Sequence, residues 1–195
     1  YNEAKTIKEI IEKVKKEKNY EKEIIVIDDY SNDGTREIIS DKLSNEINKI
    51  ILNEKNYGKG YSVRKGIEAA TGDVIIIQDA DLEYDPSDYI KLIEPINKNY
   101  ADVVYGSRFS GSEEKAVLFF WHRVANFLLT ALSNMLTNLN LTDMETGYKV
   151  FKRSVLQSIE VQENSFTIEP EITIKLAKKK FIFFEVPISY YGRSY

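Results

Sequence analysis

The sequence predicts an α/β domain in which helices cover both faces of a mainly parallel central sheet. Four consecutive aliphatic residues at 74–77, all of them β-branched, are typical of a strand buried on both faces. Short apolar runs of this kind alternate along the chain with amphipathic segments of helical spacing, which is the pattern of a parallel sheet with crossover helices. The 195 residues contain no linker-like stretch, so we expect one domain over 1–195.

The first half of the chain predicts four helices and four strands. Residues Ile7, Ile10, Ile11 and Val14 recur at helical spacing between charged residues, and Asp85 before Pro86 is a typical helix start. In order, the predicted elements are a helix at 4–18, a strand at 23–27, a helix at 35–44, a strand at 50–52, a helix ending near Ala70, the strand at 74–77, a helix at 86–98 and a strand at 103–105.

The second half begins with a segment of different character at 116–141, rich in Leu, Phe, Trp and Ala. Polar residues interrupt it too often for a membrane span, so we expect a helix that lies partly at a membrane interface. Phe119–Trp121 beside His122 and Arg123 would suit the headgroup region of a bilayer. The alternative is a core helix with polar edges. The remaining predicted elements are a strand at 148–151, helices at 153–159 and 169–179, and a strand at 181–186.

Composition excludes several classes of function. A net charge of -4 argues against a protein that binds nucleic acid through bulk charge, so we expect no nucleic-acid partner. The absence of cysteine excludes disulfides and thiolate chemistry and is compatible with the cytoplasm, and the single histidine, His122, excludes a multi-histidine metal site. The chain opens on polar residues 1–3 without a signal peptide, and we expect a first strand and a C-terminal tail outside this sequence.

Two acids, Asp79 and Asp81, follow the buried strand directly. Alternate residues of an extended segment point the same way, so both carboxylates can face one hard cation, Mg²⁺ or Mn²⁺, that bridges two phosphates. The alternative is a pair of solvated loop acids that cap a helix. Ligands of α/β sheets bind beyond the carboxyl ends of the strands, so 28–29, 79–81 and 106–108 should lie together.

Several short motifs, each weak alone, gain weight from their order and spacing. They are Tyr1-Asn2-Glu3, Ile27-Asp28-Asp29 with Ser31, Asp33-Gly34-Thr35, Asn56 with Gly58-Lys59-Gly60, Gly72-Asp73, Asp79-Ala80-Asp81-Leu82, Gly106-Ser107-Arg108, Asp143 with Thr146-Gly147, and Glu185-Val186-Pro187-Ile188 with Arg193. Over essentially the whole chain, these motifs resemble the family 2 glycosyltransferases of the GT-A (Rossmann-like) fold. The resemblance is to those that transfer sugars to polyprenyl phosphates, similar to dolichol-phosphate mannosyltransferase.

The resemblance implies a site for a nucleotide-sugar donor. Tyr1, Glu3 and Asp29 would hold base and ribose, and Asp28 would be structural. The other implied donor ligands are Lys59, Asp79, Ala80, Asp81 and Arg123. The implied metal ligands are Asp79, Asp81 and Glu83, although many relatives have Gln at the last position.

The resemblance also implies the reaction, a single inverting displacement in which a nucleoside diphosphate leaves the anomeric carbon. Arg108, Arg123 and Arg193 would neutralise phosphates, although each could instead form a surface salt bridge. A polyprenyl (dolichyl or undecaprenyl) phosphate at the cytoplasmic face of a membrane would need no strong base. A sugar hydroxyl would need one, and Asp143 or Glu145 is the natural candidate.

Three other readings of the sequence can be compared with this one. A phosphatase of the haloacid dehalogenase type expects a small hydroxyl residue soon after the second Asp, where 82–84 is Leu-Glu-Tyr. A dinucleotide-binding enzyme needs G-x-G-x-x-G, and 58–66 has the wrong spacing. A binding domain without catalysis would have no need of Asp79, Asp81 and Arg193. The choice between UDP and GDP, the sugar and the oligomeric state stay open.

Overall fold

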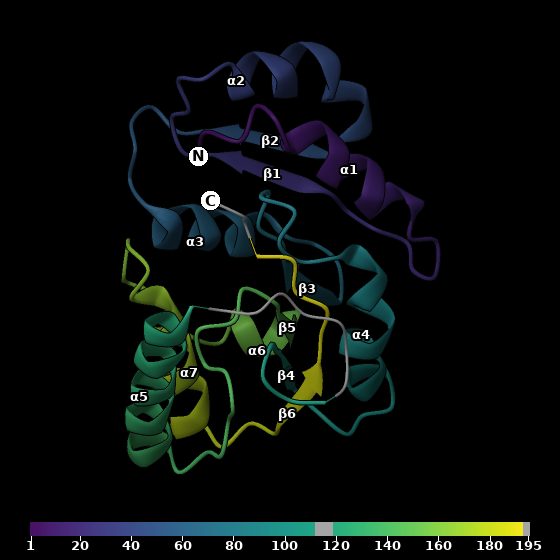
Figure 1. The fold of residues 1–195 in the computed structure, drawn as a ribbon. Helices are drawn as coiled ribbons and strands as arrows, with labels where there is room; N and C mark the ends of the chain where they lie inside the picture. Colours follow the sequence, from purple (N-terminus) through teal and green to yellow (C-terminus); the bar gives the residue numbers. More distant parts are fainter. Residues whose placement is uncertain (112–118, 193–195) are drawn as a thin grey trace.

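The computed structural model describes residues 1–111 and 119–192, and the ribbon in Figure 1 shows their arrangement. The described strands form two sheets, a parallel pair and a four-stranded sheet of order β3-β5-β4-β6. Their bounds are β1 (Ile25–Asp28), β2 (Lys49–Leu52), β3 (Val74–Ile77), β4 (Val103–Ser107), β5 (Lys149–Lys152) and β6 (Phe183–Pro187).

Strand directions confirm an α/β fold with mainly parallel strands. β1 pairs in parallel with β2, and β4 pairs in parallel with β6. β5 is antiparallel to both β3 and β4, so it runs against the other three strands of its sheet. The reversal follows from the connection, because Lys149, the first residue of β5, pairs with Ile77 and Tyr105 near the carboxyl ends of β3 and β4. Strand β5 therefore begins at the end of the sheet where the predicted site residues lie, beside the carboxyl ends of β3 and β4.

The predicted helices are present with shifted ends. Predicted helix 35–44 is α-helical only in its first turn and continues as a π-helical turn (Ile38–Lys42), and 86–98 begins with a 3₁₀ turn (Pro86–Asp88). The bounds are α1 (Ile7–Lys16), α2 (Thr35–Glu37), α3 (Lys59–Ala69), α4 (Tyr89–Asn97), α5 (Phe120–Thr137), α6 (Arg153–Leu156) and α7 (Ile168–Lys178).

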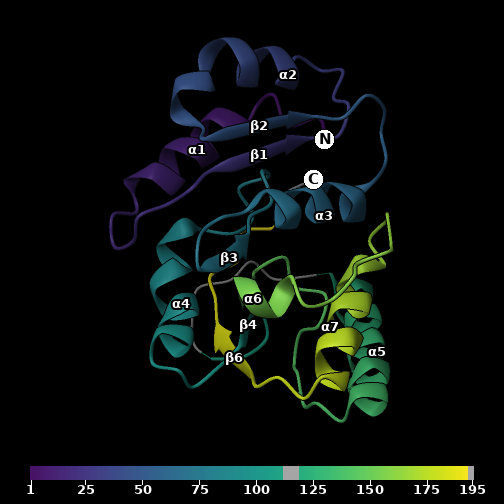
Figure 2. The same ribbon diagram turned by 180° about the vertical axis from the view of Figure 1, so that it is seen from behind.

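Alternate residues of the strands divide the core between the two faces of the larger sheet. Val104 and Val150 pack with residues of α1 and α4, whereas Val103, Tyr105 and Phe151 pack with residues of α6 and α7. Helices thus cover both faces, as predicted, and Figure 2 shows α6 and α7 from the side opposite to Figure 1. The apolar stripe predicted for the first helix is buried on α1, where it belongs to the first of these clusters.

Helix α5 has its polar side turned toward the protein. Its buried residues are Asn126, Thr130 and Ser133. Its exposed large apolar residues are Phe120, Trp121, Phe127, Leu128, Leu129, Leu132, Met135 and Leu136. The helix packs against α7 at the outer edge of the molecule in both views. The core-helix interpretation of this segment is therefore wrong. None of the helices in the described ranges is long and apolar enough to cross a bilayer.

Candidate active site

The turn after β3 presents the two predicted acids in different settings. The Asp79 carboxylate accepts a hydrogen bond from Lys59 Nζ, with 3.1 Å between Oδ2 and Nζ. The Asp81 carboxylate accepts one from the backbone N–H of Glu83 at 3.1 Å, which tightens the turn. Leu82, between Asp81 and Glu83, has φ 64°, in the left-handed region. The chain thus reverses sharply right after the strand, which keeps both acids at its carboxyl end.

Lys59 and Asp79 form one end of a line of alternating charges. Lys59 Nζ also lies 3.2 Å from Glu169 Oε1, and Lys149 Nζ lies 2.6 Å from Glu169 Oε2. Burial alone would raise the pKa of Glu169, but the charges of Lys149 and Lys59 outweigh it and lower that pKa. For Lys59, burial alone would lower the pKa, but the negative charges of Asp79 and Glu169 outweigh burial, and the pKa of Lys59 is raised. These shifts keep Glu169 ionised and Lys59 protonated at neutral pH.

The loop 142–147 reaches the Asp79 turn because it carries Gly147. A Cβ at Gly147 would lie 2.7 Å from Asp79 Oδ2 and 2.8 Å from a ring carbon of Tyr84. The Gly147 N–H donates a hydrogen bond to the Tyr84 hydroxyl oxygen at 2.9 Å. Real side-chain contacts are not this short, so only glycine lets the loop lie against the acid.

The same loop places Asp143 against Arg108, the residue that follows β4. Arg108 Nε and Nη2 each donate to a different Asp143 oxygen at 2.7 Å, forming a bidentate pair. The Arg108 backbone N–H and Asn126 Nδ2 of α5 each donate to the same carboxylate at 3.1 Å. Asp143 is fully buried. Its carboxylate therefore fixes the guanidinium of Arg108, and it is not presented to a substrate as a base.

Glu185 of β6 anchors the start of this loop. Its carboxylate accepts hydrogen bonds from the backbone N–H groups of Thr142, at 2.9 Å, and Asp143, at 3.1 Å. The Thr142 hydroxyl donates a third at 2.8 Å. The Glu-Val-Pro motif near the C-terminus thus has a structural role, because its glutamate fixes the backbone that carries Asp143.

Glu145 is the acid of the loop that has no such partner. Its side chain is half-buried, and none of the described residues forms a hydrogen bond or ion pair with it. Burial raises its pKa, an effect that Lys149 opposes and Glu169 reinforces. Of the two acids predicted as a possible base, Glu145 therefore has the environment of one.

The acids after β1 organise the glycine-rich loop. Asp29 is buried and accepts hydrogen bonds from the backbone N–H groups of Tyr57, at 2.9 Å, and Gly58, at 2.7 Å. Gly58 has φ 98°, and a Cβ there would lie 2.3 Å from the Asn164 carbonyl oxygen. Asp28 accepts from the Ser31 N–H at 3.0 Å, a structural role, as expected. Because Lys59 follows Gly58 directly, this loop delivers Lys59 to Asp79.

The N-terminal residues lie beside the loop after β1. The Asn2 N–H donates to Ser31 Oγ at 2.8 Å and the Glu3 N–H to Thr35 Oγ1 at 2.9 Å. Tyr1 is exposed. The structure thus places Tyr1 and Glu3 at the carboxyl end of β1, the edge where the resemblance puts the base and ribose.

Comparison with known proteins supplies the family. The family model described as "Glycosyl transferase family 2" matches residues 1–160. The chain belongs to glycosyl transferase family 2. The dolichol-phosphate mannosyltransferase of Pyrococcus furiosus is 30% identical over 195 residues, which are 97% of this chain and 54% of that protein. A Methanococcus voltae protein named UDP-N-acetylglucosamine–dolichyl-phosphate N-acetylglucosaminyltransferase is 30% identical over 206 residues, covering 96% of this chain and 81% of its own length.

Solved structures confirm the fold of this family 2 chain. Glucosyl-3-phosphoglycerate synthase from Mycobacterium tuberculosis, in complex with Mn²⁺ and UDP-glucose, superposes with a TM-score of 0.74 at 19% identity, covering 99% of this chain and 69% of the synthase. At this identity the likeness concerns the fold. Among the curated relatives, the Haloferax volcanii glycosyltransferase AglJ is 29% identical and the chain spans 61% of its length. The chain thus spans between half and two thirds of the length of AglJ and of the Pyrococcus enzyme.

The predicted metal ligands fit a two-carboxylate site better than a three-carboxylate one. Asp79 Oδ2 already holds a cation, the Lys59 ammonium. Glu83 Oε2 accepts a hydrogen bond from the Tyr190 hydroxyl at 2.9 Å. Within 1–111 and 119–192, no three His, Cys, Asp or Glu side chains are grouped as a metal site. Magnesium bound by one or two carboxylates takes its other ligands from phosphates and water, so Asp79 and Asp81 suit a metal that arrives with a diphosphate.

The structure brings two of the three predicted arginines together. The guanidinium carbons of Arg108 and Arg123 lie 5.6 Å and 5.9 Å from the centroid of the same ring, that of Phe109. Arg123 is exposed near the start of α5. Ala80 is partly buried against the core beneath the Asp79 turn. Arg193 lies outside the described residues.

Sequence reasoning missed Lys149 and Glu169. Lys149 is a charged residue inside an apolar strand pattern, and this was the available signal that it has a buried partner. Glu169 opens α7 beside Pro170, so it was indistinguishable from a helix-start acid. Their partnership joins residues 20 apart in sequence. It could not be read from local spacing.

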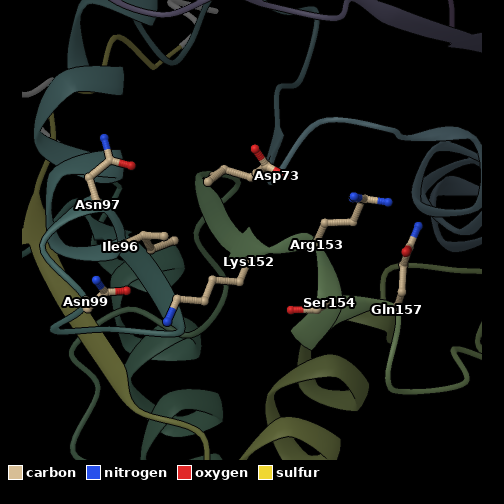
Figure 3. A pocket seen from close by; sticks show the side chains of 9 residues that line it. Asp73, Ile96, Asn97, Asn99, Lys152, Arg153, Ser154 and Gln157 are labelled. Atoms are coloured by element: carbon tan, nitrogen blue, oxygen red, sulfur yellow. The ribbon is translucent and has the colours of Figure 1, made fainter.

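A hollow of about 510 Å³ lies away from this site, at the opposite end of β3. Figure 3 shows its wall, with Asn97 and Asn99 on one side and Arg153, Ser154 and Gln157 on the other. It includes Asp73 and Val74, where β3 begins, whereas Asp79 and Asp81 follow the end of the strand. The hollow is therefore separate from the candidate site.

Proposed function

We propose that the chain transfers a sugar from a UDP- or GDP-sugar to a polyprenyl phosphate, with inversion, at a membrane surface. One observation carries the choice of acceptor. Helix α5 exposes an apolar face, and its opposite face donates a hydrogen bond from Asn126 to Asp143, the acid that fixes Arg108. One face of α5 could thus contact lipid, while its other face contacts the residue that holds Arg108, a phosphate-binding group in this proposal.

On the donor side, Asp79 and Asp81 would hold the divalent cation, Mg²⁺ or Mn²⁺, against the diphosphate. The bound ion supplies Lewis-acid stabilisation of the leaving nucleoside diphosphate. Lys59, 3.1 Å from Asp79, adds a further positive charge at the same place. Tyr1, Glu3 and Asp29 line the edge where base and ribose would lie, and Ala80 leaves room between the two acids.

On the acceptor side, Arg108 and Arg123 would bind the lipid phosphate. Two nitrogens of Arg108 are held by Asp143, so its remaining donor face is fixed before the acceptor arrives. We assign Asp143 as a positioning residue for Arg108. Arg193, as implied by the resemblance, would add a third guanidinium. A phosphate acceptor is already anionic near neutral pH and needs no base.

The names of the relatives support this choice of acceptor. The Pyrococcus furiosus and Methanococcus voltae proteins are named for transfer to dolichol phosphate and dolichyl phosphate. Because the chain spans only part of the Pyrococcus protein, we carry the acceptor over as a proposal. Peripheral attachment at the cytoplasmic face of a membrane belongs to the same proposal, and the exposed residues of α5 support it.

A second candidate is transfer to a sugar hydroxyl. Glu145 favours it, because a half-buried carboxylate with a raised pKa and no described hydrogen-bond partner is suited to accept a proton. In that case, Glu145→Gln would abolish transfer. With a lipid phosphate acceptor the same substitution leaves most of the activity.

The decisive assay measures release of nucleoside diphosphate from UDP- and GDP-sugars with Mn²⁺. We expect release on adding polyprenyl phosphate and none with saccharides alone. The opposite pattern would select the hydroxyl acceptor. Asp79→Asn and Asp81→Asn should each reduce the rate by roughly 10²-fold or more, the usual cost of removing transition-state charge stabilisation.

Donor identity can be found first with a thermal-shift panel of nucleotide sugars and Mn²⁺, since a ligand bound only by the folded chain raises its melting temperature. Asp79→Asn should remove the metal-dependent part of the shift. Asp73→Asn, at the other end of β3, is the matched control and should keep it. A metal-dependent shift that survives in both Asp79→Asn and Asp81→Asn would refute the metal assignment.

A further inference from the structure

Four charged side chains from four parts of the fold alternate in sign across the candidate site. In order they are Lys149 of β5, Glu169 of α7, Lys59 of α3 and Asp79 after β3. The links are 2.6 Å from Lys149 Nζ to Glu169 Oε2, 3.2 Å from Glu169 Oε1 to Lys59 Nζ, and 3.1 Å from Lys59 Nζ to Asp79 Oδ2. Two positive and two negative charges balance, so the line is neutral without any bound ligand.

The two ends of this line differ in burial. The Lys149 side chain is fully buried, and its ammonium also donates to the Thr146 carbonyl oxygen and lies 4.8 Å from the centre of the Tyr105 ring. Glu169 is 8% exposed, whereas Lys59 and Asp79 are 20% and 30% exposed. The Lys149–Glu169 half is therefore fixed inside the protein. The Lys59–Asp79 half faces the space where a donor diphosphate would lie.

We propose that the Lys59 ammonium takes the place of the metal at Asp79 Oδ2. It stays there until the metal and the donor diphosphate bind together. Lys59 then turns from Asp79 to the diphosphate while Glu169 keeps hold of it. Glu169 acts as the positioning residue of this exchange, and Lys149 fixes Glu169. The inference rests on the proposed function and adds a mechanism by which metal and donor favour each other's binding.

Electrostatics gives the reason for the coupling. A free divalent cation must share Asp79 Oδ2 with the Lys59 ammonium 3.1 Å away, and the other anion beside Lys59, Glu169, is already paired with Lys149. A diphosphate supplies that anion. Lys59 is the first residue of α3, so its backbone is held by the helix and only the side chain has to rotate.

The test is a titration of Mn²⁺ into the chain by calorimetry at low ionic strength, with and without UDP or GDP. Without nucleotide, Lys59→Met should bind Mn²⁺ about tenfold more tightly than the unmodified chain, because the competing charge is gone. With the nucleotide that raises the melting temperature, this advantage should disappear. The factor by which nucleotide improves Mn²⁺ binding should therefore be about tenfold smaller in Lys59→Met.

Two variants serve as controls. Lys59→Arg keeps the charge and should keep the weak Mn²⁺ binding of the unmodified chain. Lys65→Met removes an exposed lysine from the same helix, where it pairs with Glu68, and should change neither titration. Melting temperatures of all variants show whether each is folded.

The outcomes separate this inference from the proposed function. Equal or weaker Mn²⁺ binding by folded Lys59→Met overturns the exchange, even if the enzyme is a metal-dependent transferase. Tighter binding that Lys65→Met reproduces overturns it too, because the effect is then general charge. If no variant binds Mn²⁺ even with nucleotide, the metal assignment of the proposed function fails instead, and the exchange fails with it.

Discussion

Helices α1 and α5 are both amphipathic, but they turn opposite sides toward the protein. α1 buries Ile7, Ile10, Ile11 and Val14 and exposes lysines and glutamates. α5 buries Asn126, Thr130 and Ser133 and exposes its aromatic and aliphatic residues. The first helix is therefore held by apolar burial and the second by hydrogen bonds. The apolar side of α5 is thus exposed, as the membrane contact that we propose would require.

The largest expected effect tests the apolar contact of α1. Ile10→Ala should lower the free energy of unfolding by roughly 2–5 kcal/mol, because the side chain is buried among tightly packed residues. The matched change on α5, Leu132→Ala, should change it by less than about 0.5 kcal/mol, because Leu132 is exposed. Urea denaturation measures both. Similar losses in the two variants would erase the contrast between the helices.

The next effect tests the hydrogen bonds of α5. The Thr130 hydroxyl accepts from the Met144 N–H at 3.2 Å and donates to Asn126 Oδ1 at 3.2 Å. Thr130→Val keeps the shape and should lower the free energy of unfolding by about 1–3 kcal/mol, because a buried N–H loses its partner. Thr137→Val, at the end of the helix, is the control with a smaller loss. A Thr130→Val chain as stable as the original would mean that apolar contacts hold α5.

A third, smaller effect concerns the outer face of α5. Phe127 is 68% exposed, and Phe127→Ser should leave unfolding unchanged but weaken binding to lipid vesicles about tenfold, through lost apolar transfer. Vesicle sedimentation measures the partition coefficient. Phe166→Ser, which removes an equally exposed ring ahead of α7, is the control. If Phe166→Ser weakens vesicle binding as much, α5 has no special role.

The smallest expected effect concerns two acids, the buried Glu169 and the half-buried Glu145, which differ in whether a charged partner lies beside the carboxylate. Glu169 is paired and its pKa is lowered, whereas Glu145 has no ion-pair partner within 1–111 and 119–192 and burial raises its pKa. A raised pKa means that the folded state binds more protons, so the contribution of Glu145 to stability falls as pH rises through its folded pKa. Glu145→Gln should therefore stabilise the chain slightly at neutral pH and not below pH about 4. Melting temperatures across pH would contradict this if the difference grew toward low pH.

Local sequence patterns were sufficient to predict the helices and strands and the position of the two acids after β3. The stripe of α1 and the Asp85-Pro86 helix start depend on neighbours in sequence, and both are present as predicted, the latter as a 3₁₀ turn. The mixture of apolar and polar residues at 116–141 predicted a helix. It did not show which side faces the protein, because that depends on Asp143, which needs a hydrogen-bond donor from Asn126.

Long-range pairing explains what sequence reasoning could not reach. Arg108 and Asp143 were each selected as site residues, but 35 positions separate them, and nothing local predicts that one holds the other. Lys59, 20 residues before Asp79, was expected near the donor and not on the metal ligand. Such pairs are fixed by which strand ends meet at one edge of the sheet, and that is a property of the whole fold.

The most direct test of the central claim joins α5 to the chemistry. It compares the rate of nucleoside diphosphate release by the unmodified chain and by Phe127→Ser on two acceptors, a long polyprenyl phosphate in vesicles and a short, water-soluble prenyl phosphate. We predict that Phe127→Ser loses about tenfold on the vesicle acceptor and nothing on the soluble one. Equal loss on both acceptors, or no loss on either, would contradict the claim that the apolar face of α5 brings the site to a lipid phosphate.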